Sequence, residues 1–134
     1  MKEDNIRSKI KSAGQFRYEN RKSWRGWLRD NHAAKGEVWV ILPKKSAGGD
    51  GYKVFYEEAV EEALCYGWVD NLGRSLDEKH TLIRFGPRKN RMAWSPSNIE
   101  RATRLIQTGR MTRAGLEVLS DDLAALANQH KTKK

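Results

Sequence analysis

The residues best suited to binding chemistry lie between Arg84 and Asn98, in the stretch RFGPRKNRMAWSPSN. From Arg84 to Arg113 the chain carries eight basic residues and a single acid, Glu100. Arginine forks bind phosphate or carboxylate in a bidentate manner, and a capped helix start adds backbone N–H donors. Trp94 could stack on a base, a sugar or a guanidinium plane. The stretch predicts an anion-binding site, and the alternative is a solvated basic loop whose tryptophan fills the core.

A second candidate is the segment Gly67-Trp68-Val69-Asp70-Asn71. An aspartate beside a glycine at a strand end often bonds neighbouring backbone N–H groups as a turn device. It could instead act as a catalytic carboxylate, or orient Arg84 or Arg88. Together the two segments give the predicted ligand-binding residues: Trp68, Asp70, Arg84, Arg88, Lys89, Arg91, Trp94, Ser95 and Asn98.

The common catalytic and metal-binding patterns do not fit. The sequence holds no GxSxG, P-loop or GxGxxG motif. One cysteine and three histidines do not form a zinc spacing: Cys65, His32, His80 and His130. We therefore assign no catalytic residue, metal or cofactor. An enzyme with a site near Asp70, Arg84 and Ser95 is kept as an alternative, with the fold bringing a histidine close to the serine.

Charge and composition widen the range of partners. The chain has 134 residues, a net charge of +9, an isoelectric point near 9.8 and a mean hydropathy of −0.82. Such a balance favours nucleic acid, anionic lipid or acidic partners. No established RNA- or DNA-binding module is evident, so charge alone predicts weak, salt-sensitive association. No signal peptide or bilayer-spanning run is evident either, and we expect a cytoplasmic protein.

The periodicity predicts one α+β domain, with several helices packed on a small β-sheet. Residues 1–15 are expected to be a basic arm, 16–127 the domain and 128–134 a basic tail. On the second helix we expect four glutamates to point away from the core as a solvated acidic face: Glu57, Glu58, Glu61 and Glu62.

The expected helices span 20–34, 55–66, 95–109 and 121–127, with a short helical piece after 111. Asn20 or Ser23 is expected to cap the first helix. Ser95 is expected to cap the third, which could instead start two residues later, and Ile99 to lie on its core face. The expected strands span 37–42 and 80–85, with a short extended piece at 68–69, and Cys65 is expected to be buried because its neighbours are apolar.

Several short blocks follow one another in a recognisable order: Trp27-Leu28, Asn31-His32, Val38-Trp39-Val40, FYEEAVEEALCYGWVD (55–70), RFGPRK (84–89), Trp94-Ser95, Asn98, GRMT (109–112) and AGL (114–116). In these blocks the chain resembles the YdeI/OmpD-associated family, also called bacteriocin-protection proteins. The resemblance covers roughly residues 16–119 and departs from the family pattern at Gly86 and at Met92-Ala93, where hydroxyl side chains are usual.

The resemblance implies a link to envelope defence against cationic peptides and to an outer-membrane porin, and it supplies no catalytic residue or cofactor. Residues and resemblance together predict a non-enzymatic domain of unknown biochemical role that binds a small or polymeric anion, with a link to stress or antimicrobial-peptide resistance. The alternative is a nucleic-acid-binding protein that uses the same surface with Arg101 and Arg104.

Overall fold

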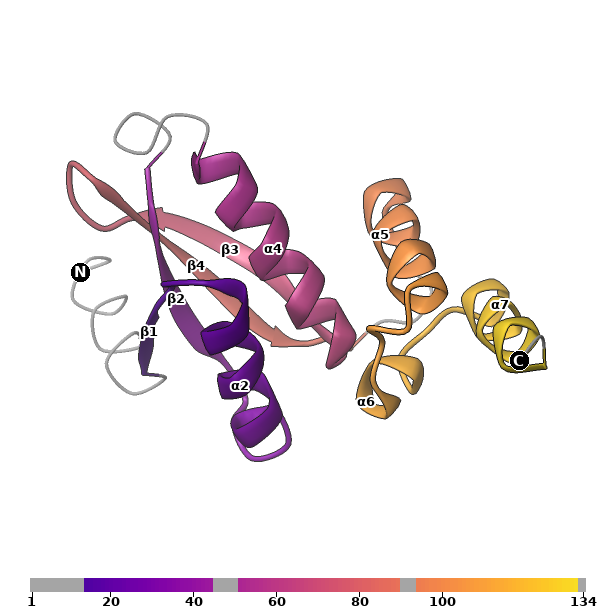
Figure 1. Ribbon diagram of the computed structural model, residues 1–134. Coiled ribbons are helices and arrows are strands. Elements are labelled where there is room, and N and C mark those ends of the chain that lie inside the picture. The colour runs from indigo at the N-terminus through magenta and orange to yellow at the C-terminus, as the bar shows by residue number, and fades with distance from the viewer. Residues whose placement is uncertain (1–13, 45–50, 90–93, 133–134) are drawn as a thin grey trace.

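The computed structural model of the chain describes residues 14–44, 51–89 and 94–132, with side chains described to residue 128. Its elements form a four-stranded mixed sheet and five helices within these residues, so the predicted α+β class is confirmed (Figure 1). Residues 1–13 of the predicted arm and the predicted binding residue Arg91 lie outside the described residues. No helix in the described part of the chain is long and apolar enough to cross a membrane.

The sheet has the strand order β1-β2-β4-β3. Its centre is formed by β2 (Val38–Pro43) and β4 (His80–Pro87), which pair antiparallel. The outer strand β3 (Trp68–Ser75) pairs antiparallel with β4. The sequence suggested only a short extended piece at the start of β3, because its second half is exposed and lacks apolar alternation.

The first strand, β1 (Gln15–Arg17), runs parallel to β2 and was not predicted. Three residues are too few to show a strand period. Parallel neighbours need a crossover, and helix α2 (Arg21–Asn31) supplies it. Asn20 caps this helix by accepting a hydrogen bond from the backbone N–H of Ser23 at 2.8 Å, as predicted from the residue type.

Helix α4 (Gly51–Cys65) lies on the same face of the sheet as α2 (Figure 1). Beneath the two helices is the main core, which includes Trp24, Val40, Trp68 and Phe85. The other face of the sheet carries a smaller buried cluster that includes Trp39 and Leu82. The two faces therefore present different side chains of the same strands.

Three further helices lie on the side of α4 away from α2: α5 (Pro96–Gln107), α6 (Arg113–Leu116) and α7 (Asp121–Thr132) (Figure 1). They share a second apolar cluster that includes Ala102, Ile106 and Leu123. Ser95 caps α5 by accepting from the backbone N–H of Asn98 at 3.1 Å. Helix α7 continues past residue 127, into the segment predicted to be a tail.

Gly67 joins α4 to β3 and determines how closely α6 packs against this junction. It has a φ of +76°, and a Cβ there would lie 2.9 Å from the carbonyl oxygen of Ala114. Both the backbone conformation and the lack of space require glycine.

Two predictions about helix faces are wrong. Glu61 is 9% exposed and Glu62 is fully buried, so α4 has no solvated acidic face along this row. Ile99, predicted to face the core, is 41% exposed. The glutamates were misplaced because their partners are arginines of distant segments, which the local pattern of α4 does not reveal.

Candidate functional site

The predicted basic stretch and the segment after α4 do lie side by side. The backbone N–H of Arg88 donates to the carbonyl of Gly67 at 2.8 Å, and Trp68 pairs with Pro87 in the β3–β4 ladder. The Arg88 guanidinium stacks over the Trp94 ring, 4.1 Å from its centroid. Burial lowers the pKa of Arg88. Trp94 is half-buried and packs against both apolar clusters, so it fills core space and also carries a cation.

Asp70 faces the helices and bonds to a tyrosine. It lies opposite Phe85 in the ladder, and directly opposed residues share a face of the sheet. Its carboxylate accepts a hydrogen bond from the Tyr56 hydroxyl at 2.5 Å. Burial, followed by this bond, raises the pKa of Tyr56. Trp68 is buried in the core and makes an edge-on contact with Trp27. Asp70 and Trp68 therefore have clear structural roles.

Arg84 lies on the opposite face of the sheet from Asp70. Its guanidinium sits 5.8 Å from the ring centroid of Trp39, in the cluster on that face, and its Nε donates to Asn71 at 2.5 Å. The alternative in which Asp70 orients Arg84 is therefore wrong, because the sheet separates the two side chains.

The remaining predicted residues surround the start of α5. Lys89 is exposed. Ser95 is exposed and engaged as the helix cap, and Asn98 accepts from Arg101 at 2.9 Å. His80 is the first residue of β4, directly after the β3–β4 turn, and contacts Asp77. The structure thus places Ser95 and His80 in separate parts of the fold.

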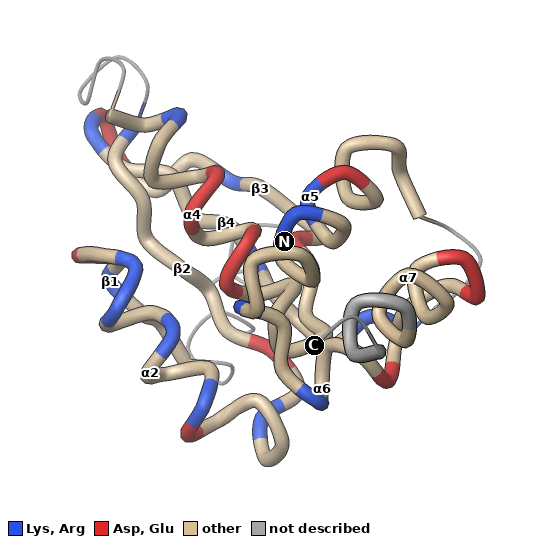
Figure 2. The backbone as a smooth tube through the Cα atoms, turned by 45° about the vertical axis from the view of Figure 1, so that its right-hand side comes forward, with Lys and Arg blue, Asp and Glu red and all other residues tan. Residues whose placement is uncertain are grey.

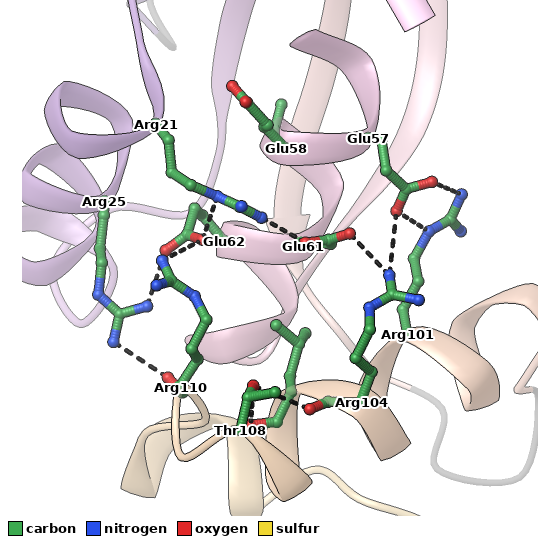
Figure 3. Close-up of polar contacts among 12 residues, drawn as sticks. Arg21, Arg25, Glu57, Glu58, Glu61, Glu62, Arg101, Arg104, Thr108 and Arg110 are labelled. Carbon is green, nitrogen blue, oxygen red and sulfur yellow. Dashed lines mark hydrogen bonds and ion pairs between the residues drawn. The ribbon is translucent and has the colours of Figure 1, made fainter. Parts of the chain in front are cut away.

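A different group of charged residues converges over α4, and we call it the arginine–glutamate cluster. Its arginines come from α2, from α5 and from the turn after α5, and they contact the glutamates of α4 from both sides of this helix (Figure 3). Figure 2 shows the acidic positions of α4 near basic positions of neighbouring elements. The cluster consists of Arg21, Arg25, Glu57, Glu61, Glu62, Arg101, Arg104 and Arg110.

Glu62 is the most heavily paired acid of the cluster. Its Oε1 accepts from Nη1 of Arg25 at 2.7 Å. Its Oε2 lies 2.8 Å from Nε of Arg21 and 2.7 Å from Nη2 of Arg110. Arg25 also donates to the backbone carbonyl of Arg110 at 3.0 Å. One buried carboxylate therefore links α2 to the turn after α5.

The other two glutamates extend the pairing along α4. Glu61 accepts from Arg21 and, at 2.7 Å, from Arg104. Glu57 forms a fork-to-fork pair with Arg101, with distances of 2.7 and 3.0 Å. The contacts advance together along α4 and α5, so the two helices run parallel. The cluster is one continuous ionic row rather than a set of separate pairs.

The electrostatics of the cluster favour full ionisation where a shift is resolved. For Arg21, burial opposes the charge most strongly, but the hydrogen bond to Glu61 and the charge attraction of Glu62 and Glu61 outweigh it and raise the pKa. The hydrogen bond to Glu57 raises the pKa of Arg101, and the same bond holds the pKa of Glu57 below its usual value. Salt bridges of this kind persist at neutral pH.

The cluster has more positive than negative charge. Five guanidiniums face three carboxylates, an excess of two, or of one when the adjacent Glu58 is counted. Glu58 accepts from the Tyr18 hydroxyl at 2.7 Å. The side chains of Arg21, Arg25, Arg104 and Arg110 remain 31–48% exposed. Arginines that are held by glutamates on one side and exposed to solvent on the other are suited to bind an anion.

Sequence reasoning singled out Arg101 and Arg104 but missed the cluster. One signal was available: Arg21 and Arg25 are four residues apart, as are Glu57 and Glu61, and this spacing places each pair on one helix face. The spacing does not show that these faces meet. Within the described residues, no group of three or more histidine, cysteine, aspartate or glutamate side chains is arranged to hold a metal ion.

Comparison with known proteins gives a family but no function. No curated protein and no solved structure matches the chain. A family model described as a domain of unknown function, DUF8412, matches residues 16–118. The resemblance to the YdeI/OmpD-associated family is therefore wrong, and the implied link to antimicrobial-peptide defence falls with it. Several of the blocks behind it serve the fold, as Gly67, Trp68 and Glu62 illustrate. With more than half of its length matched, the chain belongs to the DUF8412 family.

Proposed function

We propose that this domain is a non-enzymatic binding module for phosphate-bearing anions, and that the arginine–glutamate cluster is its binding surface. The observation that carries the proposal is the gathering of five guanidiniums on one row of buried or half-buried glutamates, with an excess of positive charge. Phosphate offers several oxygens to arginine forks that approach from different sides. The net charge of +9 would raise the local concentration of such ligands.

The binding surface is open rather than enclosed, which limits the affinity for a single phosphate. Ion pairs at exposed positions are screened by solvent and salt and contribute about 1 kcal/mol or less each. Tight binding therefore requires several contacts at once. We expect pyrophosphate or an oligophosphate to bind more tightly than inorganic phosphate.

Nucleic acid is the second candidate, and the arrangement of α2 favours it. Arg21, Arg25 and Arg29 follow at intervals of four residues, which places a row of arginines along one side of the helix for about 12 Å. A row of this length exceeds one phosphate group. The predicted basic stretch, with Lys89 and the Arg88–Trp94 stack, stays a second possible contact surface.

The test measures binding of inorganic phosphate, pyrophosphate and a fluorescent 20-nucleotide single strand, each across a salt series. Arg104→Ala removes the most exposed arginine of the cluster, and we expect up to about five-fold weaker binding, since an exposed ion pair contributes about 1 kcal/mol or less. Arg29→Ala is the matched control, because this exposed arginine pairs with Asp30 outside the cluster. It should change pyrophosphate binding by less than about two-fold.

The salt series separates the two candidates. Binding of a strand should weaken with a slope of about −0.7 per phosphate contacted, whereas binding of one pyrophosphate should respond less steeply. If the wild-type protein binds none of the three probes at low salt, the proposed function is refuted. Equal losses of pyrophosphate affinity in Arg104→Ala and Arg29→Ala would refute the cluster as the binding surface.

A further inference from the structure

Glu62 is out of reach of any ligand and yet occupies the centre of the cluster. Its side chain is fully buried, and it contacts three guanidiniums, those of Arg21, Arg25 and Arg110. One carboxylate would be neutralised by one arginine. Three partners on a single acid are more than charge balance requires, so neutralisation does not account for the arrangement.

The geometry of the arginines shows what Glu62 does to them. Arg21 and Arg25 lie one turn apart on α2, so their like charges repel when both side chains point the same way. Arg110 reaches the same place from the turn after α5. Ion pairs with both oxygens of Glu62 hold the three guanidiniums together against this repulsion, and those of Arg25 and Arg110 are also hydrogen bonds.

We propose that Glu62 is the positioning residue of the anion-binding surface; this inference rests on the proposed function. Glu62 acts on a bound anion in two opposite ways. Its negative charge repels the anion, and its bonds fix the guanidiniums before the anion arrives. Long arginine side chains lose much rotamer freedom when they are ordered, and a site that is already ordered avoids that loss on binding. The positioning effect outweighs the repulsion, because Glu62 orders three arginines at once.

The central experiment compares Glu62→Gln with Glu100→Gln, using pyrophosphate as the probe. Each variant removes one negative charge, but Glu100 is exposed on α5 and outside the cluster. We expect Glu62→Gln to bind pyrophosphate about ten-fold more weakly than wild type, and Glu100→Gln to bind equally or slightly more tightly. If Glu62→Gln binds as tightly as Glu100→Gln, or more tightly, the inference is overturned. Absence of binding by the wild type would instead overturn the proposed function.

A spectroscopic measurement distinguishes lost positioning from a general structural defect. Ordered guanidiniums give resolved arginine Nε–H signals in NMR spectra. Glu62→Gln should lose the signals of the arginines around it while the backbone amide signals of the sheet keep their positions, and Glu100→Gln should keep both. Retention of the arginine signals in Glu62→Gln would contradict the inference.

A second variant keeps the test decisive if Glu62→Gln does not fold. Arg25→Lys preserves the charge but replaces the fork that joins Glu62 to the backbone carbonyl of Arg110. If the fixed geometry governs affinity, Arg25→Lys should weaken pyrophosphate binding about five-fold at unchanged net charge. Unchanged affinity would show that charge alone is sufficient and would overturn the inference.

Discussion

The contact between α6 and the end of α4 leaves no space for one added methyl group. Gly115 packs against the last turn of α4, and a Cβ there would lie 2.5 Å from the carbonyl oxygen of Cys65 and 2.8 Å from that of Leu64, and would collide with the sulfur of Met111. The methionine can move, but the two backbone carbonyls cannot. Gly115→Ala must therefore push α6 away from α4.

The cost follows from what this displacement breaks. Overpacking costs about 1–3 kcal/mol. The backbone N–H and the hydroxyl of Thr112 both donate to the carbonyl of Cys65, and each such bond contributes about 1 kcal/mol. Alanine recovers up to about 1 kcal/mol through its higher helix propensity. We expect Gly115→Ala to lose about 2–4 kcal/mol, a fall in melting temperature of about 10 °C.

Urea and thermal unfolding measure this loss, with Gly26→Ala as the matched control. Gly26 lies inside α2, where a Cβ would approach only the Arg29 guanidinium at 3.9 Å, an ordinary contact. The control should therefore stabilise the protein by about 0.5–1 kcal/mol. Equal or higher stability of Gly115→Ala would refute the packing argument. Because Arg110 precedes α6, Gly115→Ala should also weaken pyrophosphate binding.

Two further predictions concern the Cys65 thiol and the Tyr56 hydroxyl. Burial raises the pKa of the Cys65 thiol to about 11, so a disulfide reagent should modify it rapidly only after unfolding. The thiol has a pKa near 9 in the unfolded chain, so between about pH 9 and pH 11 it ionises in the unfolded chain but stays protonated in the folded protein. Its contribution to stability therefore falls as pH rises over that range, and Cys65→Ala should show a shallower decline. Tyr56→Phe removes the bond to Asp70 and should cost about 1–2 kcal/mol in urea unfolding. Tyr52 stacks on the Tyr56 ring, and its hydroxyl makes no hydrogen bond within the described residues, so Tyr52→Phe should cost less than about 0.5 kcal/mol. Equal losses in the two variants would contradict the role of the Tyr56 bond.

Local signals in the sequence were sufficient for the class of fold and for most of its elements. The apolar run at 38–42 predicted β2, because a strand buried on both faces needs no alternation. Asn20 and Ser95 predicted the starts of α2 and α5, because capping depends on bonds within three residues. The burial of Cys65 also followed from its apolar neighbours and is confirmed.

The candidate site could not be predicted in the same way, because its contacts join residues far apart in the chain. Arg84 and Asp70 were predicted to belong to one binding site, but their side chains lie on opposite faces of the sheet. In the sequence Glu62 has the pattern of a solvated helix residue. In the structure it is covered by three guanidiniums, which come from α2 and from the turn after α5. The sequence by itself determined that the protein is basic and of the α+β class, since charge and periodicity are local properties. Only the tertiary structure decided which charges meet, because an ion pair depends on distance in space rather than along the chain.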